Sequence, residues 1–203
     1  MKKNDLTSLV VYFTEWFSGI VILNLCWLLF SLPIITIIPA TNAVFEVIYQ
    51  WKMTEKPKDL FKEFKFNFFN HFNRSYKLGL PILITIFVIA IDIYFLNNQT
   101  IDTVWFHILK YAFYTLAVLI LLTILYSYAL SKVLGNNSFQ IFLIGFVTLI
   151  GNPMIALAIV ASLLVMIIII LIFPSMFFFI SMSGIVWLGL TAIFYSLEDK
   201  EKD

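Results

Sequence analysis

The side chains in this sequence that could do chemistry are polar groups set inside long apolar stretches. The candidates are Asn24, Asn42, Glu46 and Asp92. Asn42 and Glu46 have i, i+4 spacing, so in a helix they lie on one face, a turn apart. If these groups face the interior of a helical bundle, they form a polar site able to bind a cation or a hydroxylated ligand.

Each candidate also has a structural alternative. Asp92 lies near the outer end of its apolar stretch, where its carboxylate can reach a membrane surface. Glu46 can pair with Lys52 or another basic residue near the cytoplasmic face, and Asn24 can hydrogen-bond to a neighbouring helix. The sequence leaves both interpretations open.

Other kinds of site are not predicted. His71 and His107 are not paired at ligand spacing, so we expect no metal site. Cys26 is the one cysteine, which excludes an intramolecular disulfide and a cysteine zinc site. The sequence has no P-loop, nucleophile elbow, HExxH or dinucleotide fingerprint. We therefore expect no enzyme activity and no cofactor, and the net charge of +1 gives no support for nucleic-acid binding.

The elements that must position these residues are membrane helices. From Val133 to Leu197 the sequence has no Asp, Glu, Lys, Arg or His. One helix of that length would be on the order of 100 Å long, against a hydrocarbon core of about 30 Å. Only 12% of all residues are charged, about half the usual share in soluble domains. Apolar stretches of helical length predict an all-α, multi-pass transmembrane bundle in a single membrane domain over residues 1–203, rather than a barrel.

Five or six spans fit the length, with one or two interfacial helices beside them. Pro33 ends the first span, and Pro39 suits the first turn of a short second helix that either spans or re-enters. Residues 139–150 are apolar but too short to span, and Asn152 and Pro153 start the helix that follows. The expected spans cover residues 14–32, 39–53, 78–96, 104–134, 153–173 and 176–195.

Residues 58–76 predict an amphipathic helix lying in the membrane plane. Aromatic residues fall on one face of this segment, and charged residues and asparagines fall opposite. Lys65 interrupts the aromatic face, but its stem can lie along lipid while the ammonium reaches water. The residues expected to contact lipid or a partner are Lys58, Phe61, Lys62, Phe64, Lys65, Phe68, Phe72 and Arg74.

Orientation follows from the distribution of lysine and arginine in short loops. The segment 52–77 is the most basic part of the chain, so we expect it in the cytoplasm, and Lys132 places the turn after it inside as well. Six crossings with both termini cytoplasmic is the preferred topology, and five with the N-terminus outside is the alternative. Many Phe and Ile residues, with Asn and Lys at polar positions, hint at a low-GC Gram-positive bacterium and its cell membrane.

The first third of the chain carries the motifs of a known family. The run NLCWLLFSLP at residues 24–33, PATNA at 39–43, Trp51 and DLFKEF at 59–64 resemble the YesL-like family of small bacterial membrane proteins, a domain of unknown function. One departure is Ile34, where many members have Gly. The resemblance carries over no catalytic residues. It implies a setting, because YesL-like genes tend to lie beside sugar ABC transporter and polysaccharide-degradation genes.

Two hypotheses follow. The first is a non-enzymatic accessory component of carbohydrate uptake, with the lipid bilayer and sugar ABC transporter permease subunits as its partners. The second is a small solute transporter or channel in its own right. The second predicts that Asn24, Asn42, Glu46 and Asp92 converge on a water-accessible cavity. The ligand and the oligomeric state lie beyond the sequence.

Overall fold

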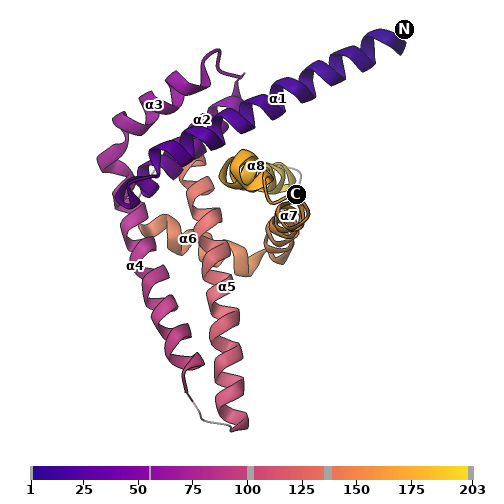
Figure 1. Cartoon of the computed structure of the whole chain (residues 1–203). Coiled ribbons are helices and arrows are strands. Elements are labelled where there is room, and N and C mark those ends of the chain that lie inside the picture. The colour runs from indigo at the N-terminus through magenta and orange to yellow at the C-terminus, as the bar shows by residue number, and fades with distance from the viewer. Residues whose placement is uncertain (1, 55, 100–102, 135–138, 201–203) are drawn as a thin grey trace.

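The chain folds into helices joined by short connections (Figure 1). The structure, a computed structural model, describes residues 2–54, 56–99, 103–134 and 139–200, and in these residues it has no strand. The helices are α1 (Lys2–Phe30), a 3-10 turn η1 (Ile34–Thr36), α2 (Ile37–Met53), α3 (Leu60–Asn70), α4 (Phe72–Asn97), α5 (Val104–Val133), α6 (Phe139–Gly151), α7 (Pro153–Ile172) and α8 (Met176–Lys200).

Five helices are long and apolar enough to cross a membrane, so the predicted class of all-α membrane bundle is confirmed. These candidate spans are Thr7–Phe30, Ile34–Met53, Gly79–Asn97, Val104–Lys132 and Pro153–Ile172. Two shorter apolar stretches, Gln140–Gly151 and Met176–Thr191, accompany them. The first of these forms α6, the helix expected to be too short to span, and it packs against α4, α5 and α7.

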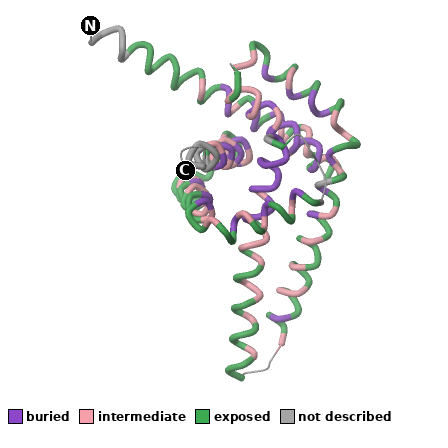
Figure 2. The backbone as a smooth tube through the Cα atoms, turned by 180° about the vertical axis from the view of Figure 1, so that it is seen from behind, coloured by how far each residue is buried: buried purple, intermediate pink, exposed green. Residues whose placement is uncertain are grey.

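The short helix α2 forms the centre of the core. Over half of its apolar stretch is buried (56%), against 17% for the corresponding stretches of α4, α5 and α7. Its neighbours are α1, α3, α4, α5 and α8, which cover it on all sides, and its buried turns lie in the densest part of Figure 2. A helix covered all round needs apolar or paired side chains on every face. Accordingly, Ala40, Ala43, Val44, Val47 and Ile48 are fully buried.

Helices α1, α2 and α3 pack side by side with alternating direction. The Trp27 indole donates to the Thr41 hydroxyl, and the Lys56 ammonium donates to the Glu15 carbonyl, so α2 returns antiparallel along α1. The α3 helix then runs back beside both. Its Asp59 side chain caps the first turn by accepting from the Lys62 N–H. The ring of Phe30 packs edge-on against Phe61, Phe64 and Phe68 of α3, at centroid distances of 4.9–6.4 Å. Helix α3 is therefore fixed to the bundle by its aromatic side.

The two helical hairpins point in different directions. Figure 1 looks nearly along α7 and α8, whereas α4 and α5 run down the same view and away from the other helices. Most residues on the distal part of α4 and α5 are exposed, green in Figure 2, and most of the others are of intermediate burial, pink in the same figure. Large apolar residues are among them, including Phe87 (64%) and Tyr111 (65%). These surfaces must be covered by lipid or by another protein.

Gly79 allows α4 to approach α2 and α5 closely. A Cβ built on this residue would collide with the Cγ2 methyl of Ile38 and would lie 2.8 Å from the Tyr128 hydroxyl. The Ile38 methyl sits on a β-branched side chain with little rotational freedom. Space, rather than backbone conformation, therefore requires glycine here.

We expect Gly79→Ala to destabilise the protein by about 1–3 kcal/mol, because the added methyl overpacks the contact between α4 and α2. Gly189→Ala in α8 is the matched control, since a Cβ there meets no atom within 4 Å. Because alanine has a higher helix propensity than glycine, this control should raise the stability by up to about 1 kcal/mol. Thermal unfolding of both variants in one detergent gives the comparison. Equal midpoints for the two would show that α4 does not pack as described.

Candidate functional site

Asn42 and Glu46 share a buried cation, Lys132. The Lys132 ammonium lies 2.7 Å from Glu46 Oε2 and donates to Asn42 Oδ1 at 2.6 Å. The Lys132 side chain is 4% exposed and that of Glu46 is 23% exposed. The i, i+4 spacing on α2 turns both acceptors towards the last turn of α5. The three side chains form a charge-compensated link between the two helices.

Lys132 was not among the predicted site residues, although the sequence contains a signal for it. Between Leu78 and Leu197 the only basic residues apart from His107 are Lys110 and Lys132, and Lys132 ends a long apolar helix. A carboxylate buried elsewhere in the bundle has few other possible partners. Lys52, the partner named in advance for Glu46, instead donates to the Thr191 hydroxyl at 2.6 Å and lies 3.9 Å from the Trp187 ring centroid.

One polar group of this cluster has no hydrogen-bond partner among the described residues. This group is the amide nitrogen Nδ2 of Asn42, which is buried in a residue that is only 2% exposed. The oxygen of the same amide accepts from Lys132, so one half of the amide is satisfied and the other is not. The cluster can hold charge in the core, but it does not line the larger grooves of the surface, whose walls are other residues.

Asn24 has a different role, because its carboxamide bonds to the backbone of α8. Its Nδ2 donates to the Phe178 carbonyl at 2.8 Å, and its Oδ1 accepts from the Met182 N–H at 2.8 Å and the Ser183 N–H at 3.1 Å. In a regular helix the Phe178 carbonyl and the Met182 N–H would bond to each other. Asn24 is fully buried. The Asn24 side chain of α1 therefore satisfies backbone groups of α8 that are not bonded to each other, as a capping side chain does at a helix end.

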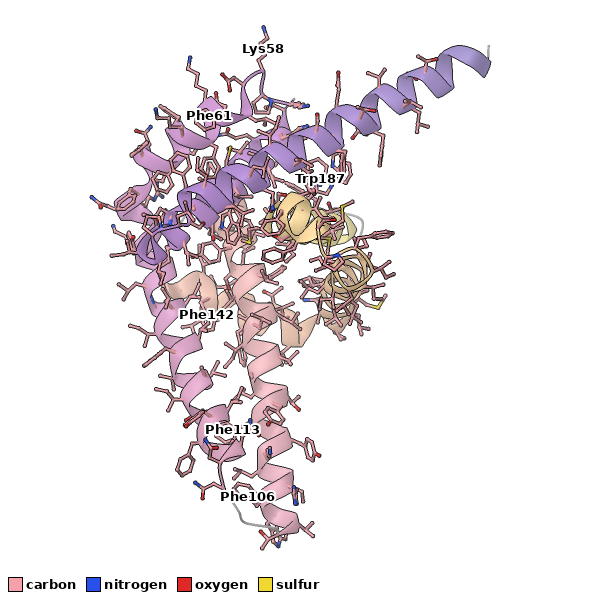
Figure 3. All side chains as sticks on the ribbon, in the orientation of Figure 1. Lys58, Phe61, Phe106, Phe113, Phe142 and Trp187 are labelled. Carbon is pink, nitrogen blue, oxygen red and sulfur yellow. The ribbon has the colours of Figure 1, made fainter. Side chains whose placement is uncertain are left out.

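Two serines complete this contact between α1 and α8. The Ser181 hydroxyl lies within hydrogen-bond distance of the Asn24 amide, and the Ser183 hydroxyl donates to the Ile20 carbonyl at 2.9 Å. Further along the same helices, Trp16 packs edge-on against Trp187, which lies where α8 passes beside α1 in Figure 3. The expectation that Asn24 bonds to a neighbouring helix agrees with these contacts.

The four candidate residues do not converge on one site. Asn42 and Glu46 meet at Lys132, while Asn24 is committed to α8. Asp92 is partly exposed on the distal half of α4, on the hairpin that extends away from the core. In the described residues, no three His, Cys, Asp or Glu side chains lie close enough to hold a metal ion.

Of the residues expected to contact lipid or a partner, Phe64 and Phe68 do not reach the surface. They are 0% and 5% exposed, because α3 turns them onto Phe30 of α1. The expectation was wrong for these two, since the aromatic face packs on protein rather than on lipid. Asn67, assigned to the polar face, is also buried and donates to the Glu63 carbonyl. Phe72 is partly exposed, and the exposed members are Lys58, Phe61, Lys62, Lys65 and Arg74.

We expect Asn24→Leu to lower stability by several kcal/mol, although leucine keeps the volume of the side chain. The change leaves buried backbone groups of α8 unpaired, at about 1–3 kcal/mol for each group. Asn98→Leu is the control, because Asn98 is exposed and its side chain bonds to the Tyr94 carbonyl of its own helix. Thermal unfolding in detergent measures both. A midpoint for Asn24→Leu equal to that of Asn98→Leu would exclude the capping role.

A double-mutant cycle tests the pairing of Lys132 with Glu46. Lys132→Met alone leaves the carboxylate of Glu46 and the Asn42 amide without their cation. Breaking a fully buried pair costs about 3–5 kcal/mol, and we expect less here since Glu46 is partly exposed. In the double variant, Glu46→Gln should recover part of the stability lost in Lys132→Met. The double variant is then less destabilised than the sum of the two single variants, and the difference is the coupling energy. Strictly additive effects on the free energy of unfolding would contradict the pairing.

Comparison with known proteins gives one match, in the N-terminal half of the chain. No curated protein and no solved structure shows significant similarity to the chain. One protein family does: its description is "Protein of unknown function, DUF624", and its match covers residues 20–93, from α1 through most of α4. That region holds Asn24, Asn42 and Glu46 as well as the whole of α3. The family resemblance expected from the motifs is confirmed over residues 20–93, which match the model of this family, and the described part of the chain has five candidate membrane spans.

Proposed function

We propose that the protein is a non-enzymatic accessory subunit of carbohydrate uptake, which associates within the bilayer with the permease subunits of a sugar ABC transporter. The carbohydrate setting comes from the family resemblance and is an association, not a property of any site. The observation that carries the role of accessory subunit is the α4–α5 hairpin. It extends from the core and exposes apolar side chains along most of its length.

The hairpin is suited to lateral contact with another membrane protein. Helices α4 and α5 diverge enough to leave an apolar groove of about 210 Å³, lined by residues such as Ile86, Ile89 and Leu121. Membrane helices associate through close packing of surfaces of this kind rather than through a hydrophobic effect. A large side chain on a permease helix can insert into the groove while the helix itself covers the hairpin.

The alternative, a small transporter or channel, has less support. It requires polar side chains that meet at a water-accessible cavity. Asn24 already bonds to the backbone of α8, and Glu46 to Lys132. Asp92 lies apart from both, so the residues chosen for that hypothesis are engaged elsewhere.

Cross-linking in native membranes tests the proposal. Cys26→Ser removes the one cysteine, and single cysteines at Phe87 in α4 or Val118 in α5 then carry a photoactivatable maleimide. Leu171 in α7, which is 75% exposed, provides the control position. We expect adducts with sugar permease subunits from Phe87→Cys and Val118→Cys and none from Leu171→Cys.

The opposite outcome is equally clear. Two results together would reject the accessory role. The protein would be purified in mild detergent as a homo-oligomer without permease subunits, and the hairpin cysteines would cross-link only to copies of the same chain. A solute flux assay of Glu46→Gln would then test the transporter hypothesis. Loss of flux in that variant would favour it.

A further inference from the structure

An apolar groove runs along the outer side of α1, next to α3. Its volume is about 610 Å³, within the usual range of about 300–1,000 Å³ for pockets that hold small molecules. The walls are formed by Leu25 and Leu29 of α1, Leu32 just after it, Phe61 of α3 and Phe178 of α8, and Cys26 is the lining residue with a polar side chain. The groove therefore offers shape and hydrocarbon contact but almost no hydrogen bonding.

The outward face of α3 beside this groove is basic. Lys58, Lys62 and Lys65 are exposed, and they alternate with Phe66 and Phe69, which are 59% and 60% exposed. Lys58 extends away from the bundle at the start of the helix (Figure 3). The Asp59 carboxylate accepts from the backbone N–H of Lys62 and caps the helix, and Glu63 lies on another side of the helix.

Phe61 connects the groove with the lysines. It lines the groove and packs against Phe30, at a centroid distance of 6.4 Å. Lys65 follows it by one helical turn on the same face, so its ammonium can reach the mouth of the groove on its flexible stem. Lys58 lies just before the helix that Asp59 caps and adds a second positive charge at the start of α3.

We propose that this surface is a binding site for one anionic phospholipid, with an acyl chain in the groove and its phosphate at Lys58 and Lys65. A phospholipid brings a hydrocarbon chain and a negative charge in one molecule, as the site requires. An extended peptide would place backbone N–H and C=O groups in a groove that cannot satisfy them. The proposal does not depend on association with a permease.

The site fits the alternative topology of five crossings with the N-terminus outside, in which the C-terminal end of α1, where Phe30 packs on α3, reaches the cytoplasmic side. The segment 52–77 is expected on the cytoplasmic side, and the cytoplasmic leaflet is rich in anionic lipids that attract lysines near the surface. Since the buried face of α3 is fixed on α1 and α2, its lysines are held in place rather than on a free tail. A rigid set of cations beside a groove can select one lipid, whereas a mobile basic segment attracts any anionic surface.

Native mass spectrometry of the purified full chain tests the site, with phosphatidylglycerol and phosphatidylcholine supplied in equal amounts. The wild-type protein should retain phosphatidylglycerol preferentially. Lys58→Gln with Lys65→Gln should lower that preference at least about tenfold, given the contribution of each lysine near a membrane surface. Lys77→Gln with Lys110→Gln removes the same charge elsewhere and should leave it unchanged.

A second variant tests the groove without altering charge. Leu29→Trp fills the groove and should abolish retention of the lipid, while Leu171→Trp, on the equally apolar surface of α7, should not. Thermal unfolding confirms that each variant is folded. Equal retention of both lipids by the wild type, or unchanged retention in Leu29→Trp, would overturn the proposal. Displacement of the lipid by inorganic phosphate would also overturn it, since that result indicates a simple anion site.

Discussion

A polar group inside hydrocarbon must find its partner within the protein, and this constraint determines how the helices of the chain are joined. Water cannot satisfy a side chain such as Asn42 on a helix covered by five others. Its oxygen is satisfied by Lys132 of α5, which also meets Glu46. At the other side of the core, the Asn24 amide is satisfied by α8. The two contacts connect the beginning of the chain with its later helices.

These two contacts differ in kind and therefore in what they specify. The link at Lys132 is ionic, and a charged pair tolerates small changes of angle between α2 and α5. The link at Asn24 is made to backbone N–H and C=O groups whose directions are fixed by the helix, so it specifies register as well as contact. The aromatic packing of Phe30 against α3 adds area without such direction. Directional bonds hold α8 in register with α1, while less directional contacts hold the other helices around α2.

Much of the fold could be predicted from the sequence, because long apolar stretches and proline positions report directly on helices. Pro153 begins α7 as expected, Pro39 lies in the first turn of α2, which begins two residues earlier at Ile37, and α6 is as short as its apolar run. The burial of α2 was not predicted, since its many small and apolar residues suit lipid and protein contact equally well. The error at Phe64 and Phe68 has the same origin: a stripe of aromatic residues shows that a face is covered, but not by what.

The candidate site could be predicted only in part, because the partners of its polar residues lie far away in the sequence. Asn42 and Glu46 were recognisable on one helix by their spacing, whereas Lys132 is 90 residues away from Asn42. The separation between Asn24 and its acceptor Phe178 is 154 residues. Local periodicity carries no information on pairings of that length. The sequence could indicate that these polar groups need partners, but not which helices supply them.

The Asn24 contact has a consequence for what counts as a structural unit in this chain. The family match spans residues 20–93, yet the polar groups it buries bond to Lys132 and to the stretch from Phe178 to Ser183, outside the matched region. A fragment cut at the limits of the match would bring unpaired amides and a carboxylate into hydrocarbon. During synthesis, Asn42 and Glu46 therefore lack their partner until α5 is made, and Asn24 lacks its partners until α8 is made, so the core is complete only when α8 has packed on α1.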